Sequence, residues 1–103
     1  MSVELDTQIN IDESTKEIML EPGKYKVLML NDDVTPMDFV VEILIEIFKH
    51  SEIVARNITM EIHENGSSVV GLYNYELAEQ KSLEATKLSR ENGFPLQVAI
   101  EKE

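Results

Sequence analysis

The sequence of 103 residues contains no cysteine and no tryptophan, and it has only four glycines and three prolines. Without cysteine the chain can form no disulfide, no thiolate zinc site and no cysteine nucleophile. The glycines are isolated and form no phosphate-binding loop, and neither a nucleophile motif nor a run of ligands at metal spacing occurs. A chain of this length is enough for one domain. We therefore expect a single domain that is not an enzyme and that needs no cofactor or metal.

Positive charge is also scarce, with nine Lys and Arg against twenty Asp and Glu, for a net charge of −11. Such a chain repels nucleic acids and anionic membrane surfaces. Glu42 and Glu46 interrupt the longest apolar stretch, so no segment is predicted to span a bilayer. The first residues lack the basic and apolar regions of a secretory signal. These features predict a cytoplasmic protein that binds neither nucleic acid nor membranes. A monomer is expected, although the sequence leaves the oligomeric state open.

Residues 1–23 differ in composition from the rest of the chain. They hold six acidic residues but only one basic residue, Lys16, and they end in the turn-forming pair Pro22-Gly23. A segment of this kind buries too little apolar surface to fold alone. We predict a flexible acidic extension over residues 1–23 and a core domain over residues 24–103.

Apolar periodicity and helix-capping residues divide the core into six elements. In order, they are a strand over 25–30, a helix from 36 to about 49, a helix over 52–64, a strand over 68–73, a helix over 75–91 and a strand after Pro95. The expected fold class is α+β, a single small domain with a three-stranded, mostly antiparallel sheet packed on three helices. We expect Thr35 to cap the first helix, with Pro36 at its first helical position and Asp38 reaching back. Ser51 and Asn74 are expected to cap the second and third helices, and Gly66 is expected to end the second helix in a left-handed cap.

Three features converge on one end of the first strand. Asn31-Asp32-Asp33 places carboxylates and an amide just before a helix, while Met37 and Val40 share a face near the start of that helix. On the second helix, the side chains of Thr59, Ile62 and His63 share one face at spacings i, i+3 and i+4.

If the two helices pack side by side, they form an apolar hollow with an acidic rim. A free α-amino group next to an apolar side chain would suit such a hollow. Two simpler interpretations remain open: Asn31-Asp32-Asp33 is also an ordinary turn, and His63 is also a favourable cation at a helix C-terminus.

Several motifs together resemble one known family. They are Asn31-Asp32-Asp33-Val34-Thr35-Pro36-Met37-Asp38-Phe39-Val40, then Ile62-His63-Glu64-Asn65-Gly66, Glu76-Leu77-Ala78-Glu79-Gln80-Lys81 and Arg90-Glu91-Asn92-Gly93-Phe94-Pro95-Leu96. In this order and spacing they resemble the ClpS family of bacterial N-degron adaptors, from about residue 24 to the C-terminus. The resemblance is specific because four separate motifs agree.

The resemblance implies a function and a role for each matched residue. The chain would bind proteins that begin with Leu, Phe, Tyr or Trp and deliver them to an AAA+ unfoldase, ClpA-like or ClpC-like. Asn31, Asp33 and His63 would hold the substrate's α-amino group, with Asp32 helping through the turn backbone. The pocket for the first side chain would be lined by Thr35, Met37, Val40, Thr59, Ile62 and Leu96.

One pocket position departs from the family pattern, because Thr59 stands where most members carry Met. A shorter residue implies a wider and less strict pocket, with better binding of Trp or of Ile and Val. By the same resemblance, Glu76 and Lys81 would dock on the unfoldase, and residues 1–23 would be engaged by it during delivery.

Two alternatives stay open from the sequence. The chain could be a regulator that docks on the unfoldase but has altered or lost degron binding. It could also be a small enzyme that uses Asp32, Asp33 and His63, although no catalytic motif supports this interpretation.

Overall fold

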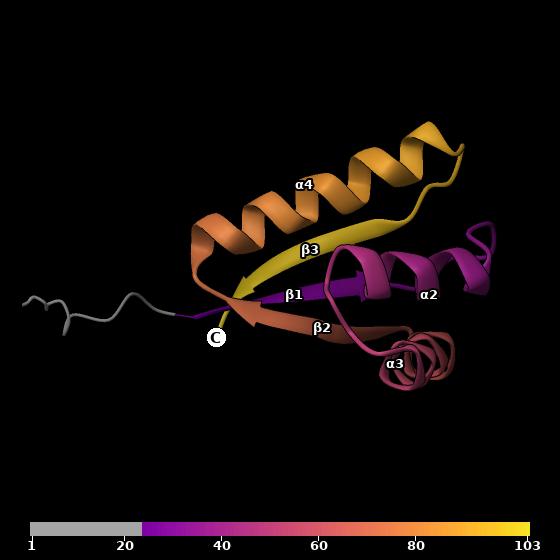
Figure 1. The fold of residues 1–103 in the computed structure, drawn as a ribbon, viewed down its shortest axis with the longest axis horizontal. Helices are drawn as coiled ribbons and strands as arrows, with labels where there is room; N and C mark the ends of the chain where they lie inside the picture. Colours follow the sequence, from indigo (N-terminus) through magenta and orange to yellow (C-terminus); the bar gives the residue numbers. More distant parts are fainter. Residues whose placement is uncertain (1–23) are drawn as a thin grey trace, which may run out of the picture.

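The computed structural model describes residues 24–103, and the predicted extension over residues 1–23 lies outside this range. The elements are β1 (Tyr25–Leu30), α2 (Met37–Glu46), α3 (Glu52–Asn65), β2 (Ser67–Tyr73), α4 (Tyr75–Glu91) and β3 (Gln97–Lys102). This is the predicted order, and the three strands form one antiparallel sheet, so the predicted fold class is confirmed (Figure 1). None of the helices in the described range is long and apolar enough to cross a bilayer.

The central strand of the sheet is β1, which pairs with β2 on one side and β3 on the other. Its alternate residues Val27 and Met29 are fully buried under the helices, because successive side chains of a strand point to opposite faces. The β1–β2 register shifts between Val27 and Leu28, where Val70 is the extra residue of a bulge. The Nε2–H of His50 donates to the carbonyl of Val70 at 2.6 Å, so the bulge is tied to the α2–α3 loop.

The start of α2 differs from the prediction. Pro36, rather than Thr35, is the N-cap residue, and α2 has no side-chain capping bond from Asp38 or from any other residue. The hydroxyl of Thr35 donates instead to Asp32 at 2.8 Å. The other two helices begin as predicted, because Ser51 and Asn74 accept from the N–H groups of Val54 and Leu77.

The chain leaves the C-terminal end of α2 through a residue with positive φ. The N–H of His50 donates to the carbonyl of Leu44 at 3.0 Å, and Lys49 has the left-handed φ of 63°. Regular helix therefore stops at Glu46, slightly before the predicted end near Lys49. Glycine is the usual residue at such a position, since it has no Cβ to oppose positive φ.

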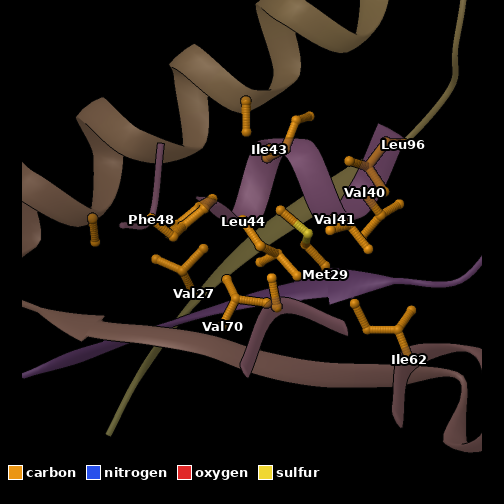
Figure 2. Close-up of a cluster of buried hydrophobic side chains, with 13 residues drawn as sticks. Val27, Met29, Val40, Val41, Ile43, Leu44, Phe48, Ile62, Val70 and Leu96 are labelled. Atoms are coloured by element: carbon orange, nitrogen blue, oxygen red, sulfur yellow. The ribbon is translucent and has the colours of Figure 1, made fainter. Parts of the chain in front are cut away.

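The core lies between the sheet and the helices (Figure 2). It combines Val27, Met29 and Val70 from the sheet with Val40, Val41, Ile43 and Leu44 from α2, Ala55 and Ile62 from α3, and Ala78 and Ala85 from α4. Small residues at spacings of four, three and four (Ala78, Ser82, Ala85 and Ser89) form the buried stripe of α4. Small side chains let this helix lie close to the strands. Leu96 closes the core at the end of the sheet that carries the candidate site.

Candidate functional site

The loop after β1 is organised by the carboxylate of Asp32. Its Oδ1 accepts from the N–H groups of Val34 and Thr35 at 2.8 and 2.7 Å, and its Oδ2 accepts from the hydroxyl of Thr35 at 2.8 Å. Burial of the carboxyl acts to raise its pKa, but these three bonds and the charge of Arg90 outweigh that effect. The pKa of Asp32 therefore lies below its ordinary value of 3.8. Asp32 thus uses its oxygens inside the loop and fixes the positions of its neighbours.

The two polar segments of the site are joined by a backbone bond. The N–H of Asn31 donates to the carbonyl of Gly66 at 2.8 Å. Gly66 ends α3 with a φ of 92°, as predicted for a left-handed cap, and its own N–H donates to the carbonyl of Ile62 at 2.9 Å. His63, one turn before this cap, is thereby held beside Asn31.

A hollow of about 270 Å³, counted to its open mouth, lies at this junction. It is lined by Leu30, Asn31, Asp32, Thr35, Met37, Val40, Thr59, Ile62, His63 and Leu96. All six residues that we predicted to surround the first side chain line it, together with three of the four predicted to hold the amine.

Asp33, the remaining residue predicted to hold the amine, lies at the mouth of this hollow. It lines an outer depression together with Asn31, Asp32 and His63. Asp33 is exposed and forms no hydrogen bond with another described side chain or backbone group, in contrast to Asp32. The mouth therefore combines a carboxylate, an amide and an imidazole, all of which can accept a hydrogen bond from an ammonium group.

Thr59 lines the hollow from α3 and is buried, with 4% of its surface exposed. Its hydroxyl donates to the carbonyl of Ala55, one turn earlier, at 2.8 Å. Because the oxygen is engaged by its own helix, Thr59 adds little polarity to the hollow. Neither Met29, which is fully buried in the core, nor Met60, which is exposed, fills the space beside it.

Two contributors to the hollow were missing from the prediction. Leu30 lines it because the last residue of β1 adjoins the loop. Arg90 positions Leu96, since one guanidinium nitrogen donates to the carbonyls of Phe94 and Leu96 at 3.0 and 2.9 Å. The Arg90-to-Leu96 motif carried this signal in the sequence, but its mechanism needs the folded geometry.

The two residues predicted to dock on a partner have different surroundings. Glu76 is exposed in the first turn of α4. Lys81 is half-buried, and its ammonium donates to the carbonyl of Ile47 at 2.6 Å while lying 5.6 Å from the centre of the Tyr73 ring. Glu76 and Lys81 are five residues apart on α4, so their side chains point in directions about 140° apart. The bond from Lys81 to Ile47 ties α4 to the end of α2.

Within residues 24–103, no group of three His, Asp or Glu side chains is arranged to hold a metal ion.

Comparison with known proteins identifies the family to which the chain belongs. The family described as "ATP-dependent Clp protease adaptor protein ClpS" matches residues 20–99. The chain is also 40% identical over 100 residues to the ClpS adapter of Treponema denticola, which covers 97% of this chain and 99% of the relative. This chain belongs to the ClpS family.

Further relatives agree. The ClpS adapter of Campylobacter jejuni is 47% identical over 94 residues, which are 88% of this chain and 93% of the relative. The solved structure of Agrobacterium tumefaciens ClpS2 bound to L-phenylalaninamide has a TM-score of 0.78 and 44% identity, and covers 81% of this chain and 100% of that chain. As a ClpS-family protein, the chain is an adaptor of the Clp protease and not an enzyme.

Proposed function

We propose that this ClpS-family adaptor captures proteins by their free α-amino group and bulky apolar first side chain, and delivers them to a ClpA-type or ClpC-type AAA+ unfoldase. The observation that carries the proposal is the convergence of three acceptors, on Asn31, Asp33 and His63, at the mouth of an apolar hollow. L-phenylalaninamide, bound by the similar A. tumefaciens ClpS2, has both required groups, a free amine and an aromatic side chain.

The mouth explains how a chain end would be distinguished from an internal residue. An ammonium group offers three charged donors, and bonds between charged partners are roughly twice as strong as neutral ones. An internal peptide nitrogen offers at most one neutral donor, so acceptors of the mouth would stay unpaired. Burial of the first side chain adds roughly 1.5–3 kcal/mol, so neither half of the site suffices alone.

The contents of the hollow support a permissive choice of first residue. Thr59 is shorter than Met, its hydroxyl is engaged by Ala55, and neither Met29 nor Met60 lines the hollow. We expect Leu, Phe, Tyr and Trp to bind, with Trp, Ile and Val binding relatively better than they would with Met at this position. The variant Thr59→Met should narrow the range and lower binding of Ile and Val first.

The proposal is tested by fluorescence anisotropy with short labelled peptides that differ only in their first residue. Peptides that begin with Leu, Phe, Tyr or Trp should bind, and acetylation of the amine or His63→Ala should reduce binding by about tenfold or more. Binding that survives acetylation would refute recognition of the free amine. If no free N-terminus binds, the chain is a regulator that docks on the unfoldase only.

For delivery, Glu76 on the exposed first turn of α4 is the clearest contact residue. Lys81 remains part of this proposal, although its ammonium also serves the fold through Ile47. Binding of the N-terminal domain of a purified ClpA-type unfoldase, measured by calorimetry, should weaken with Glu76→Ala. Unchanged binding would move the docking surface away from this turn.

A further inference from the structure

The wall of the hollow that Leu96 provides differs from the other walls, because it belongs to neither a helix nor a strand. Leu96 lies between the end of α4 at Glu91 and the start of β3 at Gln97. Its side chain is nevertheless buried, and it lies beside Val40 of α2 (Figure 2). The other lining residues stand on β1, α2 and α3 or in the loop after β1. The position of Leu96 therefore depends on the contacts that hold a short irregular segment.

Two side-chain contacts hold this segment. One guanidinium nitrogen of Arg90 donates to the carbonyl of Phe94 at 3.0 Å and to the carbonyl of Leu96 at 2.9 Å. The ring of Phe94 lies edge-on against the ring of Phe39 on α2, with centres 4.8 Å apart. Between the two bonded carbonyls stands Pro95, whose ring fixes its own φ. The wall can shift only if the bonds to Arg90 break.

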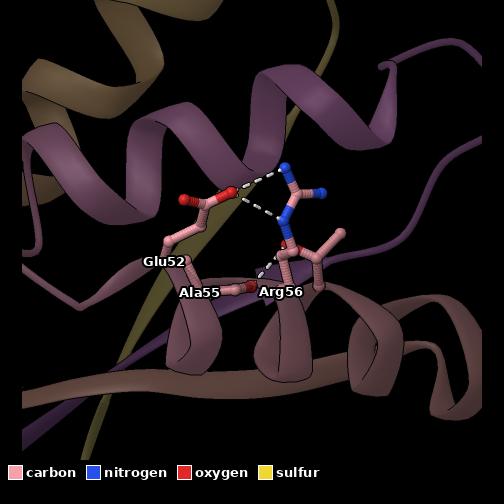
Figure 3. Close-up of polar contacts among 4 residues, drawn as sticks. Glu52, Ala55 and Arg56 are labelled. Carbon is pink, nitrogen blue, oxygen red and sulfur yellow. Dashed lines mark hydrogen bonds and ion pairs between the residues drawn. The ribbon is translucent and has the colours of Figure 1, made fainter.

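The chain has two arginines, and they use their guanidinium groups differently. The Nε and Nη2 groups of Arg56 donate to Glu52 at 3.1 and 3.0 Å, one turn earlier on the exposed surface of α3 (Figure 3). Such a pair acts within its own helix and contributes little beyond it. Arg90 instead reaches past the end of α4 to the backbone of the segment that follows. Arg56 is therefore a matched control for Arg90.

The charge of Arg90 also acts on a second wall of the hollow. Burial tends to raise the pKa of Asp32, and Arg90 is among the groups that lower it. Asp32 in turn fixes the loop that carries Thr35. Arg90 thus bonds to the backbone of one wall and lies near the carboxylate that organises another.

We propose that Arg90 is a positioning residue that sets the width of the hollow through Leu96 and so helps to determine which first side chains are accepted. The inference rests on the proposed function. Arg90 does not line the hollow, so its action is indirect. While Leu96 is held, every first side chain meets a wall at one fixed place. If the wall is released, the large ring of Trp gains room, whereas a Leu side chain loses contact with Leu96.

The test measures anisotropy with the full chain and two labelled peptides that begin with Leu or Trp and are otherwise identical. Arg90→Met keeps an unbranched side chain but removes the donors, so affinity should fall about fivefold for Leu and less than about twofold for Trp. Arg90→Lys should keep the parent ratio to within about twofold, because one ammonium has three donors and can serve both carbonyls. Arg56→Met should leave the ratio unchanged.

A double-mutant cycle separates action through the wall from a general effect on folding. Leu96→Val shortens the wall directly, so Arg90→Met should change the ratio of Trp to Leu much less in that background. Phe94→Leu weakens the other contact of the segment and should shift the ratio in the same direction as Arg90→Met. Urea unfolding establishes that each variant is folded where its binding is measured.

Each contrary result has a separate meaning. Equal losses for Leu and Trp would overturn the inference while leaving the proposed function in place, as would additive effects of Arg90→Met and Leu96→Val or an equal shift with Arg56→Met. If Arg90→Met does not fold, an unchanged ratio in Phe94→Leu overturns the inference instead. Failure of the parent chain to bind either peptide would overturn the proposed function and this inference together.

Discussion

Two adjacent aspartates in the loop after β1 have the same chemistry but different surroundings. Asp32 accepts three hydrogen bonds from Val34 and Thr35, whereas Asp33 is exposed at the mouth of the hollow. The first carboxylate builds the loop, and the second is available to a ligand. A substitution at one position should therefore affect a different property from a substitution at the other.

Asp32→Asn should lower the free energy of unfolding by about 1–3 kcal/mol, because charged hydrogen bonds of the loop are lost. Asp33→Asn should change stability by less than about 0.5 kcal/mol, as is usual for exposed positions. It should nevertheless weaken binding of Leu-starting peptides. Urea unfolding and anisotropy on the same samples check both halves, and equal stability of the two variants would contradict the assignment.

The lowered pKa of Asp32 gives stability a dependence on acid pH. Because the folded pKa lies below the unfolded value of 3.8, the contribution of this group is complete above 3.8 and is lost as pH falls through the folded pKa. The stability gap between the parent chain and Asp32→Asn should therefore narrow at acid pH. Urea unfolding at neutral and acid pH measures the gap, and a pH-independent gap would refute the role of the charge.

At the scale of the element, α2 is one of the two helices that line the hollow. It supplies Met37 and Val40 to the hollow. Its N-terminus has no side-chain capping bond, and the residue with positive φ after its C-terminus is a lysine and not a glycine. Its first turn follows the Asp32 loop, and its last turn is closed by Lys49 at positive φ and by the ammonium of Lys81. Both closures at the C-terminal end can be tested by substitution.

Lys49→Gly should raise the free energy of unfolding by about 1 kcal/mol, since a left-handed φ costs a residue with a Cβ roughly 1–2 kcal/mol. Lys87→Gly provides the control, because it removes an exposed lysine from the interior of α4 and should cost about 0.5–1 kcal/mol. Thermal and urea unfolding measure both effects. A loss of stability in Lys49→Gly would show that its side chain matters more than its backbone angle.

Lys81→Met should lower the free energy of unfolding by about 1–2 kcal/mol, because the carbonyl of Ile47 loses its charged donor. Lys87→Met, an exposed position of the same helix, should have little effect. If Lys81→Met is as stable as the parent chain but loses binding to the unfoldase, docking alone explains the residue. Loss of both properties would support the two roles together.

Much of the fold could be predicted because the residues that begin and end its helices bond to backbone groups close to them in the sequence. Ser51, Asn74 and Gly66 each satisfy nearby backbone groups, and all three act as predicted. The predicted capping role of Thr35 was wrong, because its hydroxyl bonds to the neighbouring Asp32 and does not cap α2. The inward position of Lys81 depends on Ile47, which is distant in sequence, so no local pattern could indicate it.

For the site, recognisable motifs indicated which residues lie together around the hollow. Leu30 was missed because it belongs to the strand pattern and lines the hollow only through its place beside the loop. The engaged hydroxyl of Thr59 could not be predicted either, because a threonine in a helix can turn its oxygen to either side. The roles of the lining residues remain predictions.

At the scale of the whole molecule, the proposed activities lie at opposite ends of the sheet. The hollow lies at Leu30, where β1 ends, about 17 Å from the start of this strand at 3.3 Å per residue. Residues 1–23 join the other end, where the rings of Tyr25 and Tyr75 lie 5.1 Å apart, next to Glu76. Capture and delivery would thus use separate surfaces.

Removal of residues 1–23 should therefore leave peptide affinity unchanged to within about twofold while abolishing delivery. Peptide anisotropy measures the first property, and degradation of a Leu-starting fluorescent protein by the Clp protease with its unfoldase measures the second. If the shortened chain still delivers substrates, residues 1–23 are not needed for delivery. Weaker peptide binding would show that the two ends are coupled.

The bond from the N–H of Asn31 to the carbonyl of Gly66 closes the chain between these residues into a ring. Asn31 and His63 stand at the closure, whereas Met37, Val40 and Thr59 belong to the body of the ring. Under the proposed function, the requirement for a free amine and the choice of first side chain would therefore reside in separable parts of one unit. Substitutions in the body would then diversify the accepted residues among relatives without disturbing the closure, so such a scaffold could evolve new specificities while the proposed recognition of chain ends is kept.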